Sequence, residues 1–561
     1  MIEPTPVQAQ IRDHEGLSLL VVAPAGCGKT EALALRAHGL IARGAVAAPR
    51  RVLVTTFSNR ARDNARDRLR AHIPGQAMRE LVTVSNFHGL AARLFRAHAN
   101  VIGLDPQMTL PESDWVAEQC LARKLSFDMT RDVQVRLREV KQRPLDDGAV
   151  DQTLQQGGNT IALQIERQRI AEVRLTYDDL PRVAELILAN DEVANLYRNH
   201  FSSVIVDEFQ DLTPQQLRIV SRIGFGKTTY AGDLAQGIYS FAGAKPNEIH
   251  AALLAECADT VEFSQSHRSS PAVLAMVNSL SKLTGGQTLT AADAASWPGG
   301  GLAGGVRFPD VDAEAAWVLS FCERILSNAP GQRIGIVART KARRRFVDAV
   351  VESSQLPSHR WEDGVLDTNT ASIMKTMLRH LSVVDYQSAG DQLQYLRRAA
   401  GLDTVQDPDD RTALFNALTW CADLLGEGNT PTAIRGRIRV GDDSTLLNLA
   451  GVHLLTGHAG KGQQFDWIVT VGLEEDTLPD FRQKGSAEAL AEEARILSVM
   501  MSRARHGVVL TVSKTVPTWS GAIRNRELSQ FWTALNAGSW IKRGAIDDWL
   551  DAADWRAVQD R

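Results

Sequence analysis

The residues best suited to chemistry lie in a turn of small residues near the start of the sequence. Residues 19–30 read L-L-V-V-A-P-A-G-C-G-K-T. The opening apolar run is too brief for a helix and predicts a buried strand. Backbone N–H groups at Gly26, Cys27 and Gly28 can surround a phosphate, and the N-terminus of the following helix adds partial positive charge. This pattern predicts a phosphate-binding loop.

Two side chains at the end of this turn suit a nucleoside triphosphate and a divalent cation. Lys29 is placed to reach the β- and γ-phosphates, and the Thr30 hydroxyl is placed to hold Mg²⁺. The match is imperfect, because Ala23 stands where the strict pattern has Gly and Pro24 follows it. A plain strand, turn and helix without a ligand is the alternative.

A pair of adjacent carboxylates follows a second buried run. Residues 203–216 read S-V-I-V-D-E-F-Q-D-L-T-P-Q-Q. One of the two acids, Asp207 or Glu208, can anchor the Mg²⁺, and the other can orient or deprotonate an attacking water. Downstream of a phosphate loop, such a pair favours a nucleotide hydrolase over two acids that only cap a helix.

Other candidates for the phosphate site are spread along the chain. Gln236, at a predicted strand end, can sense a γ-phosphate, and Arg268, before a helix, can clamp a phosphate. Arg503, at the end of a helix, can face a γ-phosphate or can only complement the helix dipole. Gln8 can read an adenine edge because an amide donates and accepts, although a solvated Gln is the simpler alternative.

Aromatic and small polar residues gather where predicted strands end. They are Phe57, Ser58, Asn59, Phe87, His88, Tyr239 and Phe241. Ligands of open α/β sheets bind at the carboxyl ends of the strands. Rings that stack on bases, beside groups that hold phosphates, suit single-stranded nucleic acid. For Phe57 and Phe87, packing in the core is an equal alternative.

Composition limits the class of protein. The 561 residues are enough for roughly three or four domains. Lys and Arg number 62 and Asp and Glu 66, so the net charge of −4 neither supports nor excludes binding of nucleic acid. The five cysteines form no C-x-x-C pair, which argues against zinc, iron–sulfur and disulfide sites. No apolar run reaches the length of about 20 residues that spans a bilayer, and the N-terminus does not resemble a signal peptide, so we expect a cytoplasmic protein without a membrane partner.

Strand and helix signals divide the chain into two α/β parts, each interrupted by a helical stretch. The expected parts are 1–92 and 200–284 as the first α/β domain, 93–199 as its helical insertion, 285–345 and 446–537 as the second α/β domain, 346–445 as its helical insertion, and 538–561 as a C-terminal tail that docks or caps. Near the end of the first insertion, Asp178 and Asp179 favour the first turn of a helix. The predicted fold class is therefore α/β.

Taken in order, these segments resemble the motifs of the UvrD/Rep/PcrA-type superfamily 1A DNA helicases. A-P-A-G-C-G-K-T is similar to motif I, V-T-T-F-S-N-R-A to motif Ia, S-N-F-H-G-L to Ib, V-I-V-D-E-F-Q-D to II and A-G-D-L-A-Q-G-I-Y-S-F-A-G-A to III. S-H-R-S resembles motif IV, L-T-G-H-A-G-K-G-Q-Q-F-D motif V and V-M-M-S-R-A motif VI. The resemblance implies two RecA-like (P-loop NTPase) domains, 1A and 2A, with ATP and Mg²⁺ between them. The helical insertions would correspond to domain 1B and a reduced 2B, and movement on single-stranded or 3′-tailed DNA would run 3′ to 5′.

The resemblance also implies roles for residues at matching positions. The ATP site would contain Gln8, Ala25, Gly26, Cys27, Gly28, Lys29, Thr30, His267, Arg268, Gln464 and Arg503. Hydrolysis would depend on Lys29, Asp207, Glu208, Gln236, Arg268 and Arg503, with Thr30 and Asp207 as the Mg²⁺ ligands. DNA would contact Phe57, Ser58, Asn59, Phe87, His88, Tyr239, Phe241, Thr456 and His458.

Four positions depart from the family pattern. Ala242 stands where the family usually has an Arg, and Gln464 replaces a Glu that would accept from the ribose. Ser498 replaces a Tyr, and Glu31 replaces a frequent Arg. None of these changes removes a catalytic group. Together they suggest weaker contact with nucleotide or DNA, or dependence on a partner.

Three functions are consistent with these observations. The first is an ATP-dependent 3′-to-5′ DNA helicase or translocase in repair, replication or defence against foreign DNA. The second is a DNA-stimulated ATPase subunit that senses DNA ends or single strands and regulates an associated nuclease, as in compact helicases of Gabija-type anti-phage systems. The third, a nucleotide-binding protein without motor function, conflicts with the intact Lys29, Asp207 and Glu208.

Overall fold

The computed structural model describes residues 3–57, 59–111, 115–361, 365–366, 368–405, 408–426, 428–440, 449–458, 461, 463–483, 485–518, 521–535 and 542–561. The chain divides into two compact units. The first consists of the residues up to Ala23 together with Gly28–Phe263, and the second of Pro24–Cys27 together with Ser264–Arg561.

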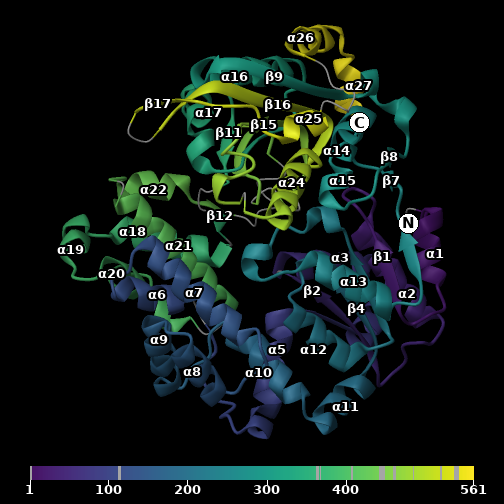
Figure 1. Cartoon of the computed structure of the whole chain (residues 1–561), viewed down its shortest axis with the longest axis vertical. Helices are drawn as coiled ribbons and strands as arrows, with labels where there is room; N and C mark the ends of the chain where they lie inside the picture. Colours follow the sequence, from purple (N-terminus) through teal and green to yellow (C-terminus); the bar gives the residue numbers. More distant parts are fainter. Residues whose placement is uncertain are drawn as a thin grey trace. The chain divides into compact units, whose positions relative to one another are not determined.

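The first unit is built on a sheet of six parallel strands in the order β3-β2-β4-β5-β1-β6. Figure 1 labels β1, β2 and β4 among them. The strands are β1 (Leu19–Val22), β2 (Arg51–Thr56), β3 (Val82–Asn86), β4 (Phe201–Asp207), β5 (Thr228–Gly232) and β6 (Thr260–Glu262). Central strands of a parallel sheet are covered on both faces, which explains why β1 is apolar and buried along its whole length. The register sets Val22 beside Gly232 and Glu262, so the phosphate loop starts at the carboxyl edge of the sheet.

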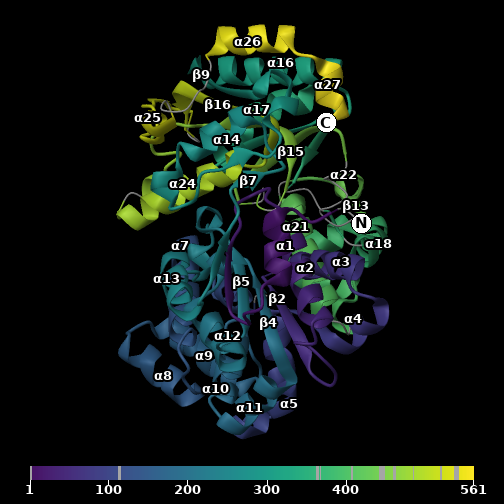
Figure 2. The same ribbon diagram turned by 90° about the vertical axis from the view of Figure 1, so that its right-hand side faces the viewer.

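Helices pack on this sheet, and those at 87–98, 179–188, 191–200, 214–224 and 246–256 share its main apolar core (Figure 2). They are α1 (Pro6–Asp13), α2 (Lys29–Ala42), α3 (Asn59–His72), α4 (Gly75–Leu81), α5 (Phe87–His98), α10 (Asp179–Leu188), α11 (Asp191–His200), α12 (Pro214–Gly224) and α13 (Pro246–Glu256). Leu94, Val183 and Ile219, from three of these helices, are buried in one cluster with Val206 of β4.

Four further helices of the first unit form an apolar core of their own. They are α6 (Trp115–Ala122), α7 (Phe127–Lys141), α8 (Asp147–Gln156) and α9 (Thr160–Ala171). Their core includes Trp115, Val133, Leu154 and Ile165. The stretch 93–199, expected as one insertion, thus contributes to two cores, because α10 and α11 pack with the sheet.

The second unit contains a second, mainly parallel sheet in the order β11-β14-β10-β15-β16-β17, with β9 also paired to β16. The strands are β9 (Leu302–Asp310), β10 (Arg333–Ala338), β11 (Ser358–Arg360), β14 (Gly451–Thr456), β15 (Phe465–Val471), β16 (Ala504–Pro517) and the antiparallel β17 (Ile523–Asn525). Helices α14 (Pro271–Asn278), α15 (Ser281–Thr284), α16 (Val311–Asn328), α17 (Lys341–Ser353), α24 (Ala487–Met501) and α25 (Phe531–Leu535), and the short strands β7 (Gln265–Ser266) and β8 (Thr290–Ala291), complete this part. Two α/β units with parallel sheets are the architecture of two RecA-like domains, which confirms the predicted fold class.

The second helical insertion also has its own core. It consists of α18 (Thr368–His380), α19 (Val383–Ser388), α20 (Gln392–Ala399), α21 (Pro408–Gly426) and α22 (Pro431–Arg437), with the strand pair β12 (Val365–Leu366) and β13 (Arg439–Val440). Met374, Leu396, Leu418 and Ile434 are buried at its centre.

The C-terminal tail forms two helices that pack on the second sheet. In α26 (Arg543–Ala552) and α27 (Trp555–Asp560), Ile546 and Val558 are buried in the same cluster as Trp467 of β15. The rings of Trp549 and Trp555 lie 5.7 and 6.0 Å from that of Trp467. The tail therefore packs against the second sheet with two helices, where the sequence predicted one docking or capping helix.

All five cysteines are buried thiols outside any disulfide. Within the described ranges, none of the helices combines the length and apolar character needed to cross a bilayer.

Candidate nucleotide and nucleic-acid sites

Glycine is required at two positions of the phosphate loop. Gly26 has φ 85° and Gly28 has φ 84°, in the left-handed region that residues with a Cβ rarely adopt. A Cβ at Gly28 would lie 2.7 Å from Nε2 of Gln8, and a Cβ at Gly26 would lie 2.6 Å from Cβ of Arg268. Each glycine therefore allows an approach to a neighbour that a side chain would block.

The first side chain of α2, Lys29, lies between the two predicted acids. Its Nζ is 3.1 Å from Oδ1 of Asp207 and also contacts Oε2 of Glu208. Burial of Lys29 disfavours its charge, but the attraction of the two carboxylates is stronger and raises its pKa. The structure thus brings together three of the residues that the sequence predicts for hydrolysis.

The two acids lie at the carboxyl end of β4 in different environments. Asp207 is 7% exposed, and its pKa is raised by burial and by Glu208, with Lys29 opposing. Glu208 has φ 60° and ψ 53°, a left-handed conformation that is strained for a residue with a Cβ. Asp207 and the Thr30 hydroxyl supply hard oxygen donors, the kind that Mg²⁺ prefers, so the donor set fits this ion.

Two residues that the sequence interpretation did not assign connect these acids to Gln236. Gln210 donates to Glu208 and accepts from the backbone N–H of Asp233. The carboxylate of Asp233 accepts from Nε2 of Gln236 at 3.0 Å. Both residues lie inside the D-E-F-Q-D and A-G-D-L-A-Q strings, but strand pairing was needed to show that they meet.

Gln8 is buried against the phosphate loop rather than solvated. It is 7% exposed, forms a capping box with Thr5 at the start of α1, and donates from Nε2 to the carbonyl of Gly28 at 3.4 Å. Its place beside the loop agrees with the predicted position at the nucleotide. Its amide also has a structural role as a helix cap.

Two of the predicted base-stacking rings lie together in the first unit. Phe57, after β2, and Tyr239, after β5, stack with centroids 5.2 Å apart and an interplanar angle of 11°. Both side chains are half-buried, so each keeps some accessible surface. Tyr239 directly precedes the short helix η4 (Ser240–Ala242).

For Phe87 the structure favours core packing, the alternative to a DNA contact. Phe87 is 5% exposed and lies in the main core cluster of the first unit, because it is the first residue of the amphipathic helix α5 and points inward. His88 is half-buried and its ring meets Tyr177 edge-on at 5.6 Å. Burial lowers the pKa of His88, which favours the neutral form of its ring.

Three other predicted DNA contacts lie wholly or partly outside the described structure. Ser58 is outside the described residues. The side chains of Asn59 and Phe241 are outside the described side chains, although their backbone belongs to α3 and η4.

In the second unit, Arg268 has the features of an anion contact. Its Nη1 is buried and has no hydrogen-bond partner among the described residues. With the Gln464 amide turned so that its oxygen faces Arg268, that oxygen accepts from Nη2 at 2.9 Å. Burial lowers the pKa of Arg268 to about 10. The neighbouring His267 is exposed, and its backbone N–H donates to the carbonyl of Gly26 at 3.0 Å.

Arg503 is held by the end of its own helix. It is 2% exposed and donates to the carbonyl of Val499 at 3.0 Å and to the Ser502 hydroxyl at 3.1 Å. Both bonds are those of a cation at a helix C-terminus.

Thr456 ends β14 half-buried, and His458, also half-buried, lies two residues further on.

The departures from the family pattern have clear local surroundings. Glu31, in the first turn of α2, lies 2.5 Å from Nε2 of His72 on α3 and so connects the two helices. Ser498 is buried in α24. Ala242 ends η4 and is followed by Gly243, whose φ is 92°.

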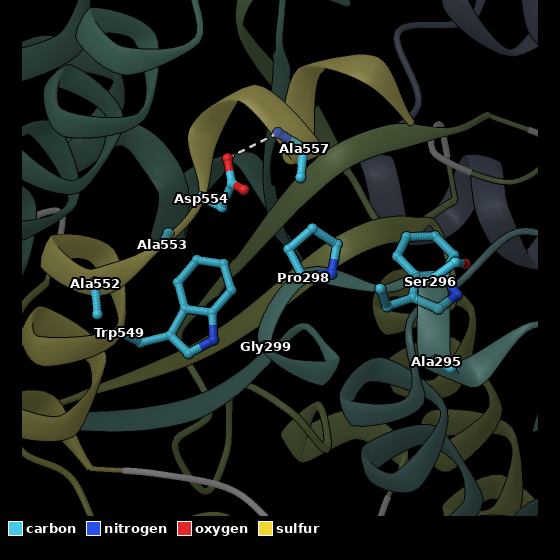
Figure 3. Close-up of a pocket in the computed structure, with 10 residues that line it drawn as sticks. Ala295, Ser296, Pro298, Gly299, Trp549, Ala552, Ala553, Asp554 and Ala557 are labelled. Atoms are coloured by element: carbon cyan, nitrogen blue, oxygen red, sulfur yellow. Dashed lines mark hydrogen bonds between the residues drawn. The ribbon is translucent and has the colours of Figure 1, made fainter.

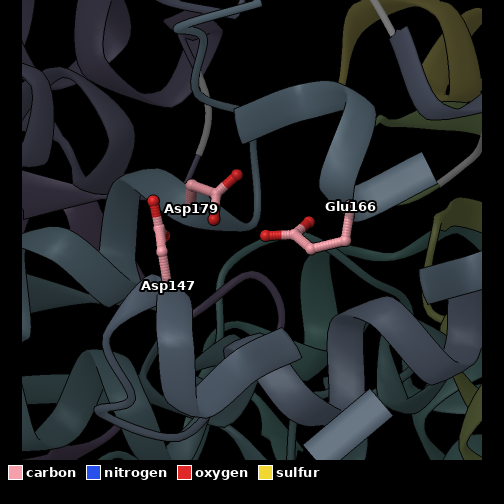
Figure 4. Close-up of side chains that lie close together, drawn as sticks. All are labelled: Asp147, Glu166 and Asp179. Atoms are coloured by element: carbon pink, nitrogen blue, oxygen red, sulfur yellow. The ribbon is translucent and has the colours of Figure 1, made fainter. Parts of the chain in front are cut away.

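A cluster of three acids in the helical insertion is balanced by three cations. Oxygens of Asp147, Glu166 and Asp179 lie within 4.8 Å of one another (Figure 4). The cations among them are Lys141, Arg169 and Arg182. Because each acid already has a cationic partner, the cluster is an ion-pair network between α7, α8, α9 and α10 and not a metal site.

A cavity of about 450 Å³ lies beside the C-terminal tail (Figure 3). Trp549, Pro298 and Ala557 are among its lining residues, and Asp554 caps α27 by accepting from the N–H of Ala557 at 3.0 Å. The residues that line it include none of the predicted site residues. The cavity is therefore separate from the predicted nucleotide and DNA sites.

Comparison with known proteins finds a family match in each unit. Residues 5–253 match the UvrD/REP helicase N-terminal domain, and residues 437–515 match the UvrD-like helicase C-terminal domain. The "ATP-dependent DNA helicase UvrD2" of Mycobacterium tuberculosis is 27% identical over 92% of this chain and 79% of that protein. The "ATP-dependent DNA helicase UvrD1" of Mycobacterium leprae is 29% identical over 49% of this chain and 39% of that protein. The "ATP-dependent DNA helicase PcrA" of Leuconostoc citreum is 28% identical over 47% of this chain and 37% of that protein.

Proposed function

Because the chain belongs to the UvrD/REP helicase family, we propose that it is an ATP-dependent DNA helicase that moves 3′ to 5′ along single-stranded DNA. One observation carries the proposal most strongly. Lys29 at the phosphate loop lies between Asp207 and Glu208 at the end of β4, with both acids in reach of its Nζ. This is the constellation that hydrolysis of a nucleoside triphosphate requires.

Each of these residues has a distinct task in the proposed reaction. Lys29 binds the β- and γ-phosphates, and Thr30 and Asp207 would hold Mg²⁺, which neutralises phosphate charge when bound. Glu208 orients the attacking water and takes its proton. Gln236 donates to the γ-phosphate from its side-chain amide.

Two arginines of the second unit are assigned to the γ-phosphate by resemblance. The buried Nη1 of Arg268, which has no partner among the described residues, supports that assignment. Arg503 also contacts Val499 and Ser502 at the end of its own helix, so stabilising that helix end is an alternative to contacting the γ-phosphate. The assignment of Arg503 therefore rests on its position in motif VI alone.

We assign the DNA contact to the ring pair after β2 and β5. Phe57 and Tyr239 present stacked faces, and base stacking on aromatic rings is tolerant of sequence. The centroid distance of 5.2 Å is too short for a base to lie between the rings, since two stacking distances sum to about 7 Å. A base therefore stacks on an outer face or separates the pair.

The second candidate function is a DNA-stimulated ATPase subunit that works with a partner such as a nuclease. The observation that favours it is Ala242 at the end of η4, where the family usually has an Arg. For either function we propose the cytoplasm as the location, because a reducing compartment keeps the five buried cysteines as thiols.

Strand displacement tests these proposals together. Duplexes with a 3′ tail or a 5′ tail are incubated with protein, ATP and Mg²⁺, and ATP hydrolysis is followed in parallel with and without single-stranded DNA. The helicase proposal predicts displacement from the 3′-tailed duplex. Displacement from the 5′-tailed duplex alone contradicts the polarity. Hydrolysis stimulated by DNA with no displacement from either duplex favours the partner-bound ATPase.

A further inference from the structure

A buried row of hydrogen bonds connects the end of β4 to the end of β5. Gln210 lies in the short helix η2 (Phe209–Asp211) and is fully buried. Its Nε2 donates to Oε2 of Glu208 at 2.5 Å, and its Oε1 accepts from the N–H of Asp233 at 2.9 Å. Asp233 in turn accepts from Nε2 of Gln236 at 3.0 Å.

Close packing leaves Gln210 little freedom. A Cβ at Gly232, the last residue of β5, would clash with Oε1 of Gln210 and would lie 2.6 Å from Cδ1 of Phe209. Strand β5 can therefore come this close to Gln210 only because its last residue is a glycine. On the other side, Glu208, with its left-handed backbone, turns its carboxylate back toward the Nε2 of Gln210.

The chemistry of the row requires an amide at this position. A carboxamide donates at one end and accepts at the other, which is what the Glu208 carboxylate and the Asp233 N–H need. A glutamate would set one carboxylate against another, and an apolar side chain would leave buried groups without partners. Burial raises the pKa of Asp233, so its ionised form depends on donors such as Gln236.

The row also leads toward the proposed DNA contact. Gln236 ends the short helix η3 (Leu234–Gln236), and Tyr239 follows three residues later, stacked on Phe57. A base that stacks on or separates these rings acts on the segment that carries Gln236.

We propose that Gln210 is a positioning residue that holds Glu208 and, through Asp233, Gln236 in one hydrogen-bonded row, and so connects the DNA-contacting segment to hydrolysis. The inference rests on the proposed function, in which Glu208 orients water and Gln236 contacts the γ-phosphate. Gln210 itself touches neither nucleotide nor DNA in this account.

The test compares wild type with Gln210→Ala and Gln210→Glu, and with Gln216→Ala as a matched control. Gln216 is a buried glutamine six residues away that caps α12 in a capping box with Thr213 and lies outside the row. For each protein, kcat and KM for ATP are measured with and without single-stranded DNA. Binding of a fluorescent ADP analogue and the thermal midpoint report folding.

We expect Gln210→Ala to lower the DNA-stimulated kcat by about tenfold or more and to leave KM for ATP within about threefold, because orientation and not binding is lost. In Gln210→Glu, the new carboxylate has no hydrogen to donate to Glu208, so kcat should fall at least as far as in Gln210→Ala. Gln216→Ala should keep the wild-type kcat. A merely structural role of Gln210 would lower the thermal midpoint and weaken nucleotide binding, whereas a positioning role lowers kcat and leaves KM unchanged.

The outcomes separate two failures. A wild-type kcat in both Gln210 variants overturns this inference alone, as does a rise of KM in step with the loss of kcat or an equal loss of kcat in Gln216→Ala. Absence of ATP hydrolysis by the wild type overturns the proposed function and this inference with it.

Discussion

Two clusters of buried charge in the first unit differ in how their charges balance. In the helical insertion, the acids Asp147, Glu166 and Asp179 meet three cations, and the pKa of Asp179 lies well below its usual range because the attraction of those cations outweighs its burial. At the phosphate loop, Asp207 and Glu208 share the cation Lys29, and the pKa of Asp207 is raised.

The difference distinguishes a structural cluster from a functional one. A fully paired set of buried charges holds helices together and has no need of a ligand. A set in which two acids share a single cation is stabilised by a further cation, and the oxygen donors at this site suit Mg²⁺. Perturbed acids beside a phosphate-binding loop are what hydrolysis requires.

The largest expected effect is on the stability that the paired cluster contributes. Asp179→Asn leaves Lys141 and Arg182 without their shared carboxylate, and loss of one partner from a buried network costs about 3–5 kcal/mol of unfolding free energy. Urea denaturation measures it. The folded fraction should keep wild-type ATP turnover, and an unchanged unfolding free energy would show that the network contributes nothing to stability.

The next effect is on activity at the phosphate loop. Glu208→Gln removes the base but keeps the shape, so kcat for ATP should fall by about 10²–10⁴-fold. The thermal midpoint should not fall, because one of two acids that repel each other is neutralised. An exposed acid of the same unit, Asp191, pairs with Arg222 at 3.4 Å and offers the control variant Asp191→Asn, which should keep wild-type turnover. Equal activity of wild type and Glu208→Gln would contradict the role of Glu208.

The two clusters should also respond to pH with opposite signs. The depressed pKa of Asp179 contributes stability that is present above its unfolded value, near 3.8, and is lost as the pH falls through the folded value. The stability advantage of wild type over Asp179→Asn should therefore shrink below about pH 4.

The pKa of Asp207 is raised in the folded protein. Above pH 3.8 the folded protein therefore binds more protons at this group than the unfolded chain does. Its stability falls as the pH rises through the folded-state pKa of Asp207. In Mg²⁺-free buffer, the unfolding free energy of Asp207→Asn should therefore increase relative to that of wild type as the pH rises above 3.8. Urea titrations of the three proteins between about pH 3 and 7 measure both trends. If the two stability differences between wild type and variant changed with pH in the same direction, the distinction between the clusters would be lost.

The smallest expected effect concerns a departure from the family pattern. Glu31→Gln removes the negative charge that faces His72 and Arg68 and that favours the first turn of α2, at a cost of about 0.5–1 kcal/mol. Chemical denaturation detects it. A larger loss in ATP turnover than in stability would instead assign Glu31 to nucleotide binding.

The sequence was sufficient where chemistry is local. Lys29 and Thr30 follow a glycine turn, and Asp207 with Glu208 follows an apolar strand, so residue type and order alone predicted one site. Asp179 shows the opposite case, because it was predicted only to favour the first turn of a helix. Its burial among cations depends on the packing of α7 and α9 against α10, which a local pattern does not contain.

Long-range packing also explains the other differences. Phe87 follows a strand end as Phe57 does, but it points into the core because it begins the inward face of α5. Gln210 and Asp233 meet only because β4 and β5 are neighbours in the sheet. Neither the strand order nor the side of a helix that faces inward can be read from a single turn.

Steady-state ATP hydrolysis by wild type and Lys29→Ala, with and without single-stranded DNA, tests the central claim most directly. In the wild type we expect hydrolysis that requires Mg²⁺ and rises with DNA. In the variant, hydrolysis should fall by at least about 10²-fold while binding of single-stranded DNA is retained. Hydrolysis by Lys29→Ala at the wild-type rate would contradict the assignment of this cluster as the catalytic site.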